Sequence, residues 1–395
     1  MKYDFDRIVD RRGTDSVKWN VSRSMFGSDD VLPMWVADMD FRAPLPVLNA
    51  IIERTGEGIL GYTMLRESFY EAVADWFRRR FGWKIGKKWT VPSPGVVPAI
   101  CTAIRAFTEP GDGVVYQPPV YQLFERSIVG MERKPVPNRL VFREREYSID
   151  FDDLEEKLKT AKMMILCSPH NPVGRVWTRG ELKVMAGMCA EHDVLLFSDE
   201  IHADLVYPGY GHVPAGAAGT AGEKLICAYS IGKTFNLAGL GASYNIIPGK
   251  ETRKRFEEAQ KGHALDTPRV FDGVALEAAY RHGVEWLDEL LSYLRENCRM
   301  IVDELPKRVP GIKVTMPQAT YLLWLDCRDM GMSQQRLERF FASEAGLGLN
   351  TGTSFGPGGE GFMRMNVACP RSLLEEALER VSTAWKRLKN GTPPE

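Results

Sequence analysis

Apolar and polar residues alternate along the chain in two distinct patterns, the first of which is helical. From residue 65 onward the apolar positions recur at intervals of three and four: Leu65, Phe69, Val73, Trp76 and Phe77. This spacing predicts an amphipathic helix. The segment ends in three arginines at positions 78–80. We interpret them as a solvated face near the helix C-terminus, where cations suit the helix dipole.

The second pattern consists of short unbroken apolar runs, each ended by polar or turn residues, at residues 114–116, 163–167, 194–198 and 225–231. Segments with helical spacing lie between them, such as residues 179–192. Apolar strands alternating with helices indicate a parallel sheet that is covered on both faces. We therefore predict a large α/β domain over residues 46–282, built on a mostly parallel, doubly wound sheet.

The last hundred residues follow a different order. A long helix is expected around residues 285–305, a strand at 320–326, a helix at 334–345 and a strand at 361–368. This order predicts a smaller α+β domain. The N-terminal forty residues are irregular, so residues 1–45 are assigned together with residues 283–395.

Charge and composition exclude several classes of function. The chain has 51 Lys plus Arg against 52 Asp plus Glu, spread along its length, which provides no basic footprint for nucleic acid. Seven cysteines without a CxxC pair are typical of a cytoplasmic protein. Residues 1–10 are too charged for a signal peptide, and no apolar run approaches the roughly 18 residues of a membrane span. We expect a cytoplasmic protein with no membrane partner.

Candidate chemistry follows the apolar runs directly. In open α/β sheets, ligands bind beyond the carboxyl ends of the strands. The run 163–167 is followed by Asn171, the run 194–198 by Asp199 and His202, and the run 225–231 by Lys233. One crevice could therefore hold an amide, a carboxylate, an imidazole and an amine.

Each of these residues also has a simpler interpretation. Asn171 could be a turn residue, and Asp199 could cap a following helix. Lys233 could be one of many exposed lysines, and His202 a hydrogen-bonded, partly buried histidine. Strand, Gly-Lys-Thr and helix form half of a nucleotide-binding loop, but Cys227 stands where that loop needs glycine. The histidine spacing matches no metal site, so no metal is expected.

A lysine, an aspartate and an asparagine at strand ends suit pyridoxal phosphate. This cofactor bonds a lysine covalently, needs a carboxylate at its ring nitrogen and accepts hydrogen bonds at its phenolic oxygen. The segment 94–100 offers a helix N-terminus for the phosphate, because its glycine allows close approach and Pro98 suits a first helical turn.

Several strings together resemble one family: SPHNPVGRVW (168–177), SDEIHADLVYPGY (198–210), GKTFNLAGLG (232–241), SPGVVPA (93–99), EPGDGVVYQPPVY (109–121) and RMNVACPR (364–371). They are similar to the MalY/PatB-type cystathionine β-lyases and cysteine C–S lyases. That family belongs to the fold type I pyridoxal phosphate superfamily, with the class I and II aminotransferases. The resemblance covers almost the whole chain.

The resemblance implies a role for each matching residue. Lys233 would be the Schiff-base lysine, Asp199 would pair with the pyridine nitrogen and Asn171 with the phenolic oxygen, and His202 would support that side. The remaining cofactor contacts would come from Tyr121 on the ring face, from Ser230 and the amides of Val96 and Val97 at the phosphate, and from Tyr62 of a neighbouring subunit in a homodimer.

Arg364 would bind the substrate carboxylate, with Asn171, Ala37 and Trp35 nearby. Core packing is the alternative for Trp35 and for Tyr321. Gly232 departs from a serine and Gln122 from a second tyrosine that relatives carry. The implied activity is α,β-elimination on L-cystathionine or L-cysteine S-conjugates, giving thiol, pyruvate and ammonia. The alternatives are an aminotransferase and a MalY-like bifunctional enzyme or regulatory binding protein.

Overall fold

The computed structural model describes residues 2–219 and 222–391. The chain divides into two compact units. The large unit consists of Ala43–Asn171 and Arg175–Asp288, and the small unit of Met1–Arg42, Pro172–Gly174 and Glu289–Glu395. Each unit has its own sheet and helices.

A seven-stranded sheet forms the centre of the large unit, in the order β2-β10-β9-β8-β7-β3-β4. Its strands are β2 (Thr90–Ser93), β3 (Gly113–Tyr116), β4 (Lys134–Pro137), β7 (Ala161–Cys167), β8 (Leu195–Asp199), β9 (Leu225–Ser230) and β10 (Ser243–Ile246). Strand β10 is antiparallel to both its neighbours, whereas β9, β8, β7, β3 and β4 are parallel. The predicted mostly parallel, doubly wound sheet is confirmed.

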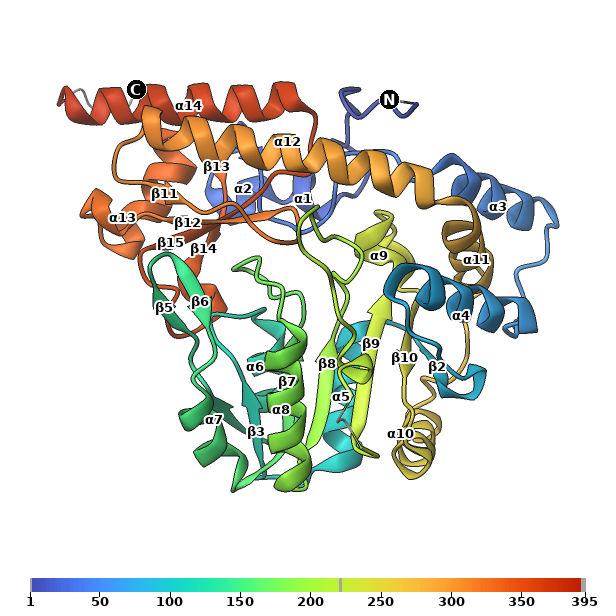
Figure 1. Cartoon of the computed structure of the whole chain (residues 1–395). Helices are drawn as coiled ribbons and strands as arrows, with labels where there is room; N and C mark the ends of the chain where they lie inside the picture. The colour runs from blue at the N-terminus through green and yellow to red at the C-terminus, as the bar shows by residue number, and fades with distance from the viewer. Residues whose placement is uncertain (1, 220–221, 392–395) are drawn as a thin grey trace. The chain divides into compact units, whose positions relative to one another are not determined.

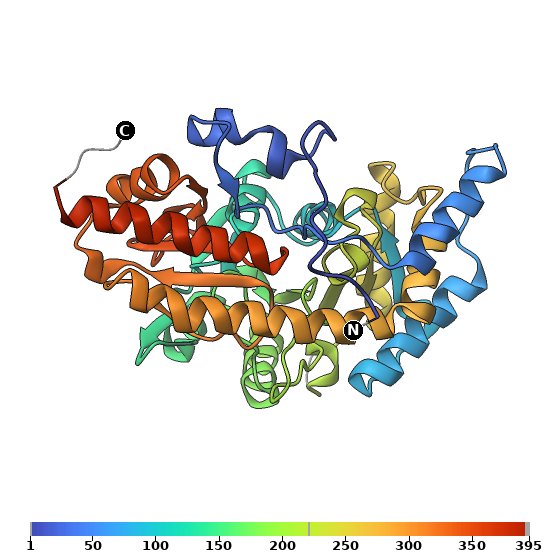
Figure 2. The same cartoon turned by 90° about the horizontal axis from the view of Figure 1, so that it is seen from above.

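Helices cover both faces of this sheet (Figures 1 and 2). One face carries α5 (Val96–Phe107), α6 (Leu123–Gly130) and α10 (Lys250–Gly262), and the other α7 (Phe151–Leu158) and α8 (Arg179–Glu191). At the β2 end, α11 (Asp272–His282) packs against α3 (Leu45–Gly56) and α4 (Glu67–Phe81). The hairpin β5 (Val141–Arg143) and β6 (Glu146–Ser148) lies between β4 and α7 in the chain.

Alternation along the strands decides which side chains face α5. Ile165, Phe197 and Ala228 are fully buried in one apolar cluster with residues of α5 and α6. Burying each large side chain stabilises the fold by about 1.5–3 kcal/mol. Because side chains alternate along a strand, Asp199 and Ser230, two residues beyond Phe197 and Ala228, lie on the same face. The core pattern therefore directs these two polar groups toward the α5 side.

The small unit contains an antiparallel sheet in the order β11-β12-β15-β14. Its strands are β11 (Lys313–Val314), β12 (Leu322–Asp326), β14 (Asn350–Thr351) and β15 (Phe362–Asn366), and β1 (Leu32–Pro33) pairs separately with β13 (Leu347–Gly348). The helices are α1 (Val17–Asn20), α2 (Ser22–Phe26), α13 (Gln334–Arg339) and α14 (Arg371–Lys389); α12 (Val284–Arg308) begins in the large unit. This is the predicted α+β composition.

Two long helices of the small unit run side by side, as both ribbon views show (Figures 1 and 2). Arg308 near the end of α12 donates a 3.1 Å hydrogen bond to Glu379 of α14. Helix α13 continues into a π-helical turn at Phe340–Glu344, so the predicted helix at 334–345 is present with a change of hydrogen-bonding pattern.

The three arginines at the end of α4 do not share one environment. Arg78 is exposed, as predicted, but Arg80 is only 27% exposed and donates a hydrogen bond to the carbonyl of Asp204. The prediction of a solvated face is therefore wrong for Arg80. Sequence spacing could not show this, because the partner lies 124 residues away.

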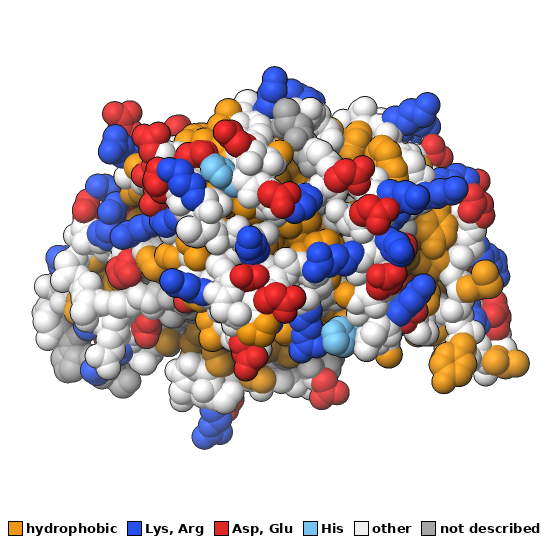
Figure 3. Space-filling view, turned by 90° about the horizontal axis from the view of Figure 1, so that it is seen from below, with side chains coloured by type: hydrophobic (Ala, Val, Ile, Leu, Met, Phe, Trp, Pro, Cys, Tyr) orange, Lys and Arg blue, Asp and Glu red, His pale blue; other side chains and the backbone are white. Residues whose placement is uncertain are grey.

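Surface charge agrees with the near-neutral total. Figure 3 shows basic and acidic side chains mixed on the face turned toward the viewer. Such mixing provides no extended basic surface for a phosphate backbone on that face. Within residues 2–219 and 222–391, no helix is long and apolar enough to cross a membrane.

Candidate active site

The carboxyl ends of β7, β8 and β9 lie next to one another in the large unit. Cys167 pairs with Asp199, and Asp199 pairs with Ala228. The loops that follow are also joined, since the Ser168 N–H donates to the Asp199 carbonyl at 2.9 Å. The register therefore brings Asn171, Asp199 and Lys233 to one edge of the sheet, as their positions after the apolar runs predicted.

Asp199 is a buried carboxylate, 4% exposed. Its Oδ1 accepts a 3.1 Å hydrogen bond from the Ile201 N–H, and residues 201–204 form turns and not a helix, so the interpretation of Asp199 as a helix cap is wrong. Burial raises the pKa of Asp199 to about 7. The Ile201 N–H and the positive charge of Lys233 oppose this rise, and the carboxylate of Glu200 adds to it. The site therefore favours a cationic group beside Asp199.

Lys233 lies on α9 (Ile231–Thr234), a single helical turn directly after β9. Ser230 caps this turn, because its Oγ accepts from the Gly232 N–H at 3.0 Å and donates to the Ala242 carbonyl at 2.7 Å. Lys233 is half-buried, which does not match the interpretation of an ordinary exposed lysine. A short, capped turn holds its backbone at the strand end.

Asp204 supports this turn and was missed by the sequence reasoning. Its Oδ2 accepts a 3.1 Å hydrogen bond from Thr234, the residue after Lys233, and its Oδ1 accepts one of 3.1 Å from Trp76. Burial raises the pKa of Asp204, although Arg80 opposes the rise. The sequence does show a second aspartate five residues after Asp199, but it does not reveal the role of this residue because its hydrogen-bond partners are distant in sequence.

Glu200 is the other residue that the sequence reasoning missed. It is fully buried and accepts hydrogen bonds from His212 (2.6 Å), from Tyr229 (2.6 Å) and from the Ala215 N–H (2.9 Å). Three donors compensate the cost of burying this carboxylate. They also anchor the loop that follows Asp199 to β9.

The start of α5 is a candidate site for an anion. Gly95 is the N-cap residue and has no side chain that could cap the N–H groups of Val96 and Val97. The helix dipole favours negative charge at this end of the helix. A Cβ on Gly232 would lie 3.1 Å from Ala238 Cα and from Ser230 Oγ. This crowding is a physical reason for glycine at position 232.

The loops that carry Asn171 and Tyr121 are joined to each other. Asn171 is 5% exposed, and its N–H donates to the Cys167 sulfur. The imidazole of His170 lies 3.0 Å from the carbonyl of Pro119, two residues before Tyr121. Tyr121 is half-buried, with its ring edge-on to that of Phe124, 6.1 Å between centroids. A hydrogen bond therefore links the loop that carries the Asn171 amide to the loop that carries the Tyr121 ring.

The remaining large-unit candidates differ in exposure. His202 is 2% exposed, so it is more deeply buried than the partly buried histidine that the sequence analysis considered. Gln122 is half-buried and its Oε1 accepts no hydrogen bond from a described residue. Tyr62 is fully exposed, in the segment after α3. The described residues of the large unit therefore form no pocket around Tyr62.

The small unit holds Arg364, Trp35 and Ala37 together. Arg364 is 4% exposed on β15, and its Nη2 donates to the Trp35 carbonyl at 2.7 Å and to Asn350 Oδ1 at 2.6 Å. Tyr321 is 1% exposed, and its hydroxyl donates to the Ala37 carbonyl at 2.9 Å. Tyr321 is therefore a buried support for Ala37, with core packing and hydrogen bonding combined.

No metal site accompanies these residues. Among the described residues, no group of three or more His, Cys, Asp or Glu side chains could hold a metal ion. The acidic and imidazole groups near Asp199 are instead paired within the fold, as Glu200 and His212 illustrate.

Comparisons with known proteins agree with this arrangement. The sequence profile of the aminotransferase class I and II family matches residues 29–381. The chain is 42% identical to the cystathionine beta-lyase PatB of Bacillus subtilis, over 96% of this chain and 99% of PatB. It is 34% identical to the protein MalY of Escherichia coli, over 98% of this chain and 100% of MalY.

The chain is also similar to a solved structure along its whole length. Cystalysin from Treponema denticola, whose structure contains pyridoxal 5'-phosphate, has a TM-score of 0.95 and 36% identity, over 98% of this chain and 100% of cystalysin. Relatives of this similarity share the fold along their whole length. The chain belongs to the aminotransferase class I and II family and, within it, to the group of PatB and MalY.

Proposed function

We propose that this chain is a pyridoxal phosphate-dependent carbon–sulfur β-lyase that acts on L-cystathionine or L-cysteine S-conjugates. The observation that carries the proposal is the buried carboxylate of Asp199 beside Lys233 at the strand ends, in a chain 42% identical to a cystathionine beta-lyase. This pairing matches the needs of the cofactor's ring nitrogen and carbonyl carbon.

The residues present fit the cofactor. A cationic group beside the buried carboxylate of Asp199 would stabilise its charged form, and the N-terminus of α5, with glycine as its N-cap residue, would attract an anion. Asp199 would hold the ring nitrogen, with Asn171 and His202 on the phenolic side and Tyr121 on the ring face. The amides of Val96 and Val97 would hold the phosphate, and the hydroxyl of Ser230 would join them by turning its proton from the Ala242 carbonyl to the phosphate. When bound, the cofactor supplies an electron sink for charge that develops at the substrate Cα.

The chain's own residues supply binding and proton transfer. The fork of Arg364 binds the α-carboxylate through two parallel hydrogen bonds, which a lysine cannot make. The Nζ of Lys233 takes the proton from Cα, and Tyr121 shields the reacting atoms from water. The Cβ–S bond then breaks with both electrons leaving on sulfur. With one water consumed, L-cystathionine gives homocysteine, pyruvate and ammonia.

A direct assay tests the reaction. Purified protein loaded with the cofactor and given L-cystathionine is expected to release pyruvate and free thiol in equal amounts without an added acceptor. Pyruvate is followed by a coupled dehydrogenase and thiol by a colorimetric reagent. The family profile makes aminotransfer the second candidate. A keto acid that forms only when a 2-oxo acid acceptor is added, with no thiol, would support that candidate and exclude the lyase.

We also propose a homodimer that works in the cytoplasm. Large apolar side chains are exposed on α3 and the segment after it: Ile52 (68%), Ile59 (76%), Leu60 (53%), Tyr62 (103%) and Met64 (78%). Contiguous exposed apolar residues favour an interface, and a two-fold pair of identical chains is the commonest assembly. None of the seven cysteines forms a disulfide bond, which suits a reducing compartment.

Subunit mixing tests the role of Tyr62. Tyr62→Ala and Lys233→Ala each remove one component of the site, and each homodimer is expected to be nearly inactive. If Tyr62 reaches the site of its neighbour, unfolding and refolding the two variants together restores activity, because each mixed dimer contains one intact site. Random pairing gives about a quarter of the wild-type sites. No recovery, in mixtures shown to be dimeric, would contradict the role of Tyr62 across the boundary.

A further inference from the structure

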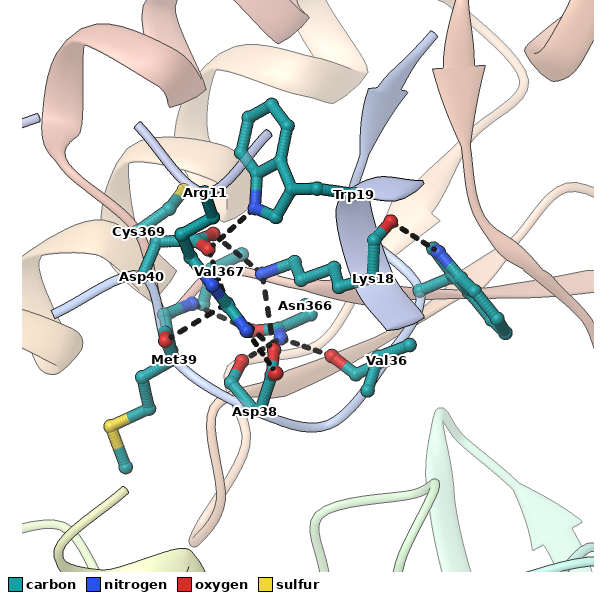
Figure 4. A network of polar contacts seen from close by, with 12 residues as sticks. Arg11, Lys18, Trp19, Val36, Asp38, Met39, Asp40, Asn366, Val367 and Cys369 are labelled. Atoms are coloured by element: carbon teal, nitrogen blue, oxygen red, sulfur yellow. Dashed lines mark hydrogen bonds and ion pairs between the residues drawn. The ribbon is translucent and has the colours of Figure 1, made fainter. Parts of the chain in front are cut away.

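A cluster of charged side chains is buried in the small unit, far along the chain from Lys233 (Figure 4). Lys18 is 1% exposed, and its Nζ lies 2.6 Å from Asp40 Oδ2. Arg11 bridges the two aspartates, with Nη1 2.7 Å from Asp40 Oδ1 and Nη2 2.6 Å from Asp38 Oδ2. The indole N–H of Trp19 also donates to Asp40, at 2.9 Å. Asp40 therefore has three donors, all from the N-terminal twenty residues.

Stability alone is a weak explanation for such a cluster. Burying a lysine and an aspartate costs several kcal/mol per ion in desolvation, and their attraction often no more than offsets it. Burial would raise the pKa of Asp40, but Lys18, Trp19 and Arg11 together hold it below its usual range. The carboxylate is thus kept charged with several short hydrogen bonds, which define a geometry more strictly than apolar packing does.

The cluster fixes the backbone of residues 35–40. The indole N–H of Trp35 donates to the Lys18 carbonyl at 3.2 Å, so the same residue that pairs with Asp40 also holds Trp35. From the other side, Asn366 Nδ2 donates to the carbonyls of Val36 and Asp38, both at 2.6 Å. The segment is therefore held from the N-terminal residues on one side and from β15 on the other.

Arg364 depends on this segment directly. Its Nη2 donates to the Trp35 carbonyl, and its guanidinium lies 4.8 Å from the centroid of the Phe355 ring. A shift of Trp35 would move the carbonyl that orients the guanidinium, and it would move Ala37 in the same direction. Both groups assigned to the substrate carboxylate would then lose their alignment, while the cofactor contacts of the large unit come from other elements.

We propose that Lys18 and Asp40 are positioning residues for the substrate carboxylate, acting through the segment 35–38 on Arg364. The inference rests on the proposed function, because it uses the assigned role of Arg364. This buried ion pair affects recognition of the amino-acid substrate and does not affect binding of the cofactor.

Lys18→Met and Asp40→Asn test the proposal in the cofactor-loaded enzyme. Both are expected to raise KM for L-cystathionine about tenfold or more with a smaller change in kcat, since lost ground-state alignment appears in KM. The Kd for pyridoxal phosphate, measured by absorbance titration of the apoprotein, should change less than about twofold, because the residues assigned to the cofactor do not belong to this cluster. If Lys18→Met does not fold, Arg11→Met breaks the same cluster from its half-buried side.

Two comparisons separate positioning from general destabilisation. Glu344→Gln breaks a matched pair in the same unit, Arg336 with Glu344 at 2.7 and 3.0 Å, and should leave KM unchanged. In an Arg364→Lys background, Lys18→Met should raise KM little further, because residues that act in one chain of contacts are not additive.

Three results would overturn the proposal: an unchanged KM in both Lys18→Met and Asp40→Asn, an equal rise in Glu344→Gln, or full additivity with Arg364→Lys. A wild-type enzyme that does not cleave L-cystathionine would instead contradict the proposed function, and the inference would fall with it. Cleavage by the wild type with unchanged KM in the variants would contradict the positioning role alone.

Discussion

Lys233→Ala is expected to lower kcat/KM for L-cystathionine by at least about 10³-fold, because a positioned acid–base group contributes about 10²–10⁴ and covalent attachment of the cofactor is lost as well. The residue lies on a capped single turn at the end of β9, held through Thr234 by Asp204. Removing the side chain leaves those contacts in place, so the loss should be chemical. Steady-state kinetics and the visible absorption band of the bound cofactor measure both effects.

The matched control for this variant is Lys224→Ala. Lys224 precedes the same strand, but it is 45% exposed and pairs with Asp193 on the surface. Exposed pairs contribute about 0–1 kcal/mol, so activity and cofactor absorption should remain at wild-type levels. Lys233→Ala should also keep the melting temperature of the wild-type apoprotein. Full activity in Lys233→Ala would exclude the central assignment of the site.

Asp199→Asn is expected to lower kcat by about 10²–10⁴-fold, because the amide keeps the shape of the side chain but cannot keep the ring nitrogen of the cofactor protonated. Cofactor binding should weaken in the same variant. The exposed Asp193, replaced by Asn, is the matched control and should change neither quantity. A variant Asp199→Asn with wild-type kcat would show that the carboxylate has no part in the reaction.

The raised pKa of Asp199 also predicts how the free energy of unfolding of the apoprotein depends on pH. The pKa of Asp199 in the folded apoprotein is raised to about 7, above the value of 3.8 for an unperturbed carboxyl group. Between these two values the folded state binds more protons than the unfolded state, so the free energy of unfolding falls as pH rises. The slope from this group is at most about 1.4 kcal/mol per pH unit.

Urea unfolding of the apoprotein at several pH values between 4 and about 7 measures this slope. Asp199→Asn should remove this negative contribution, because the amide does not titrate, so the slope of the free energy of unfolding against pH should become more positive than in the wild type. Added cofactor should shift the slope in the same direction, since a cationic ring nitrogen beside Asp199 favours the charged carboxylate. Identical profiles for wild type and Asp199→Asn would contradict the raised pKa.

Much of the fold was predictable because its signals are local. The apolar runs at 163–167, 194–198 and 225–231 correspond to β7, β8 and β9 with shifts of one or two residues at their ends. Strand ends of a parallel sheet meet at one edge, so the positions of Asn171, Asp199 and Lys233 after the apolar runs were enough to group them. The last run was one residue too long, because Ile231 already begins α9.

The roles of individual polar groups were not predictable in the same way. Arg80 ends a charged helix terminus that the sequence pattern indicates to be solvated, yet it packs beside Asp204. Asp199 occupies a position typical of a helix cap, but the chain turns there instead of forming a helix. Both predictions were wrong because the burial of a polar side chain depends on partner residues that are distant in sequence, and a local pattern does not contain those residues.

The sequence by itself indicated the alternation of strands and helices and the grouping of polar residues after three strands, because these depend on a spacing of two or about four residues along one segment. The family was indicated separately, by the resemblance of several motif strings. The tertiary structure decided which charges are buried and what they hold: Asp204 with Trp76, 128 residues apart, and Trp35 with Arg364, 329 residues apart. A buried polar group needs a partner to offset desolvation, and only the folded chain brings that partner near.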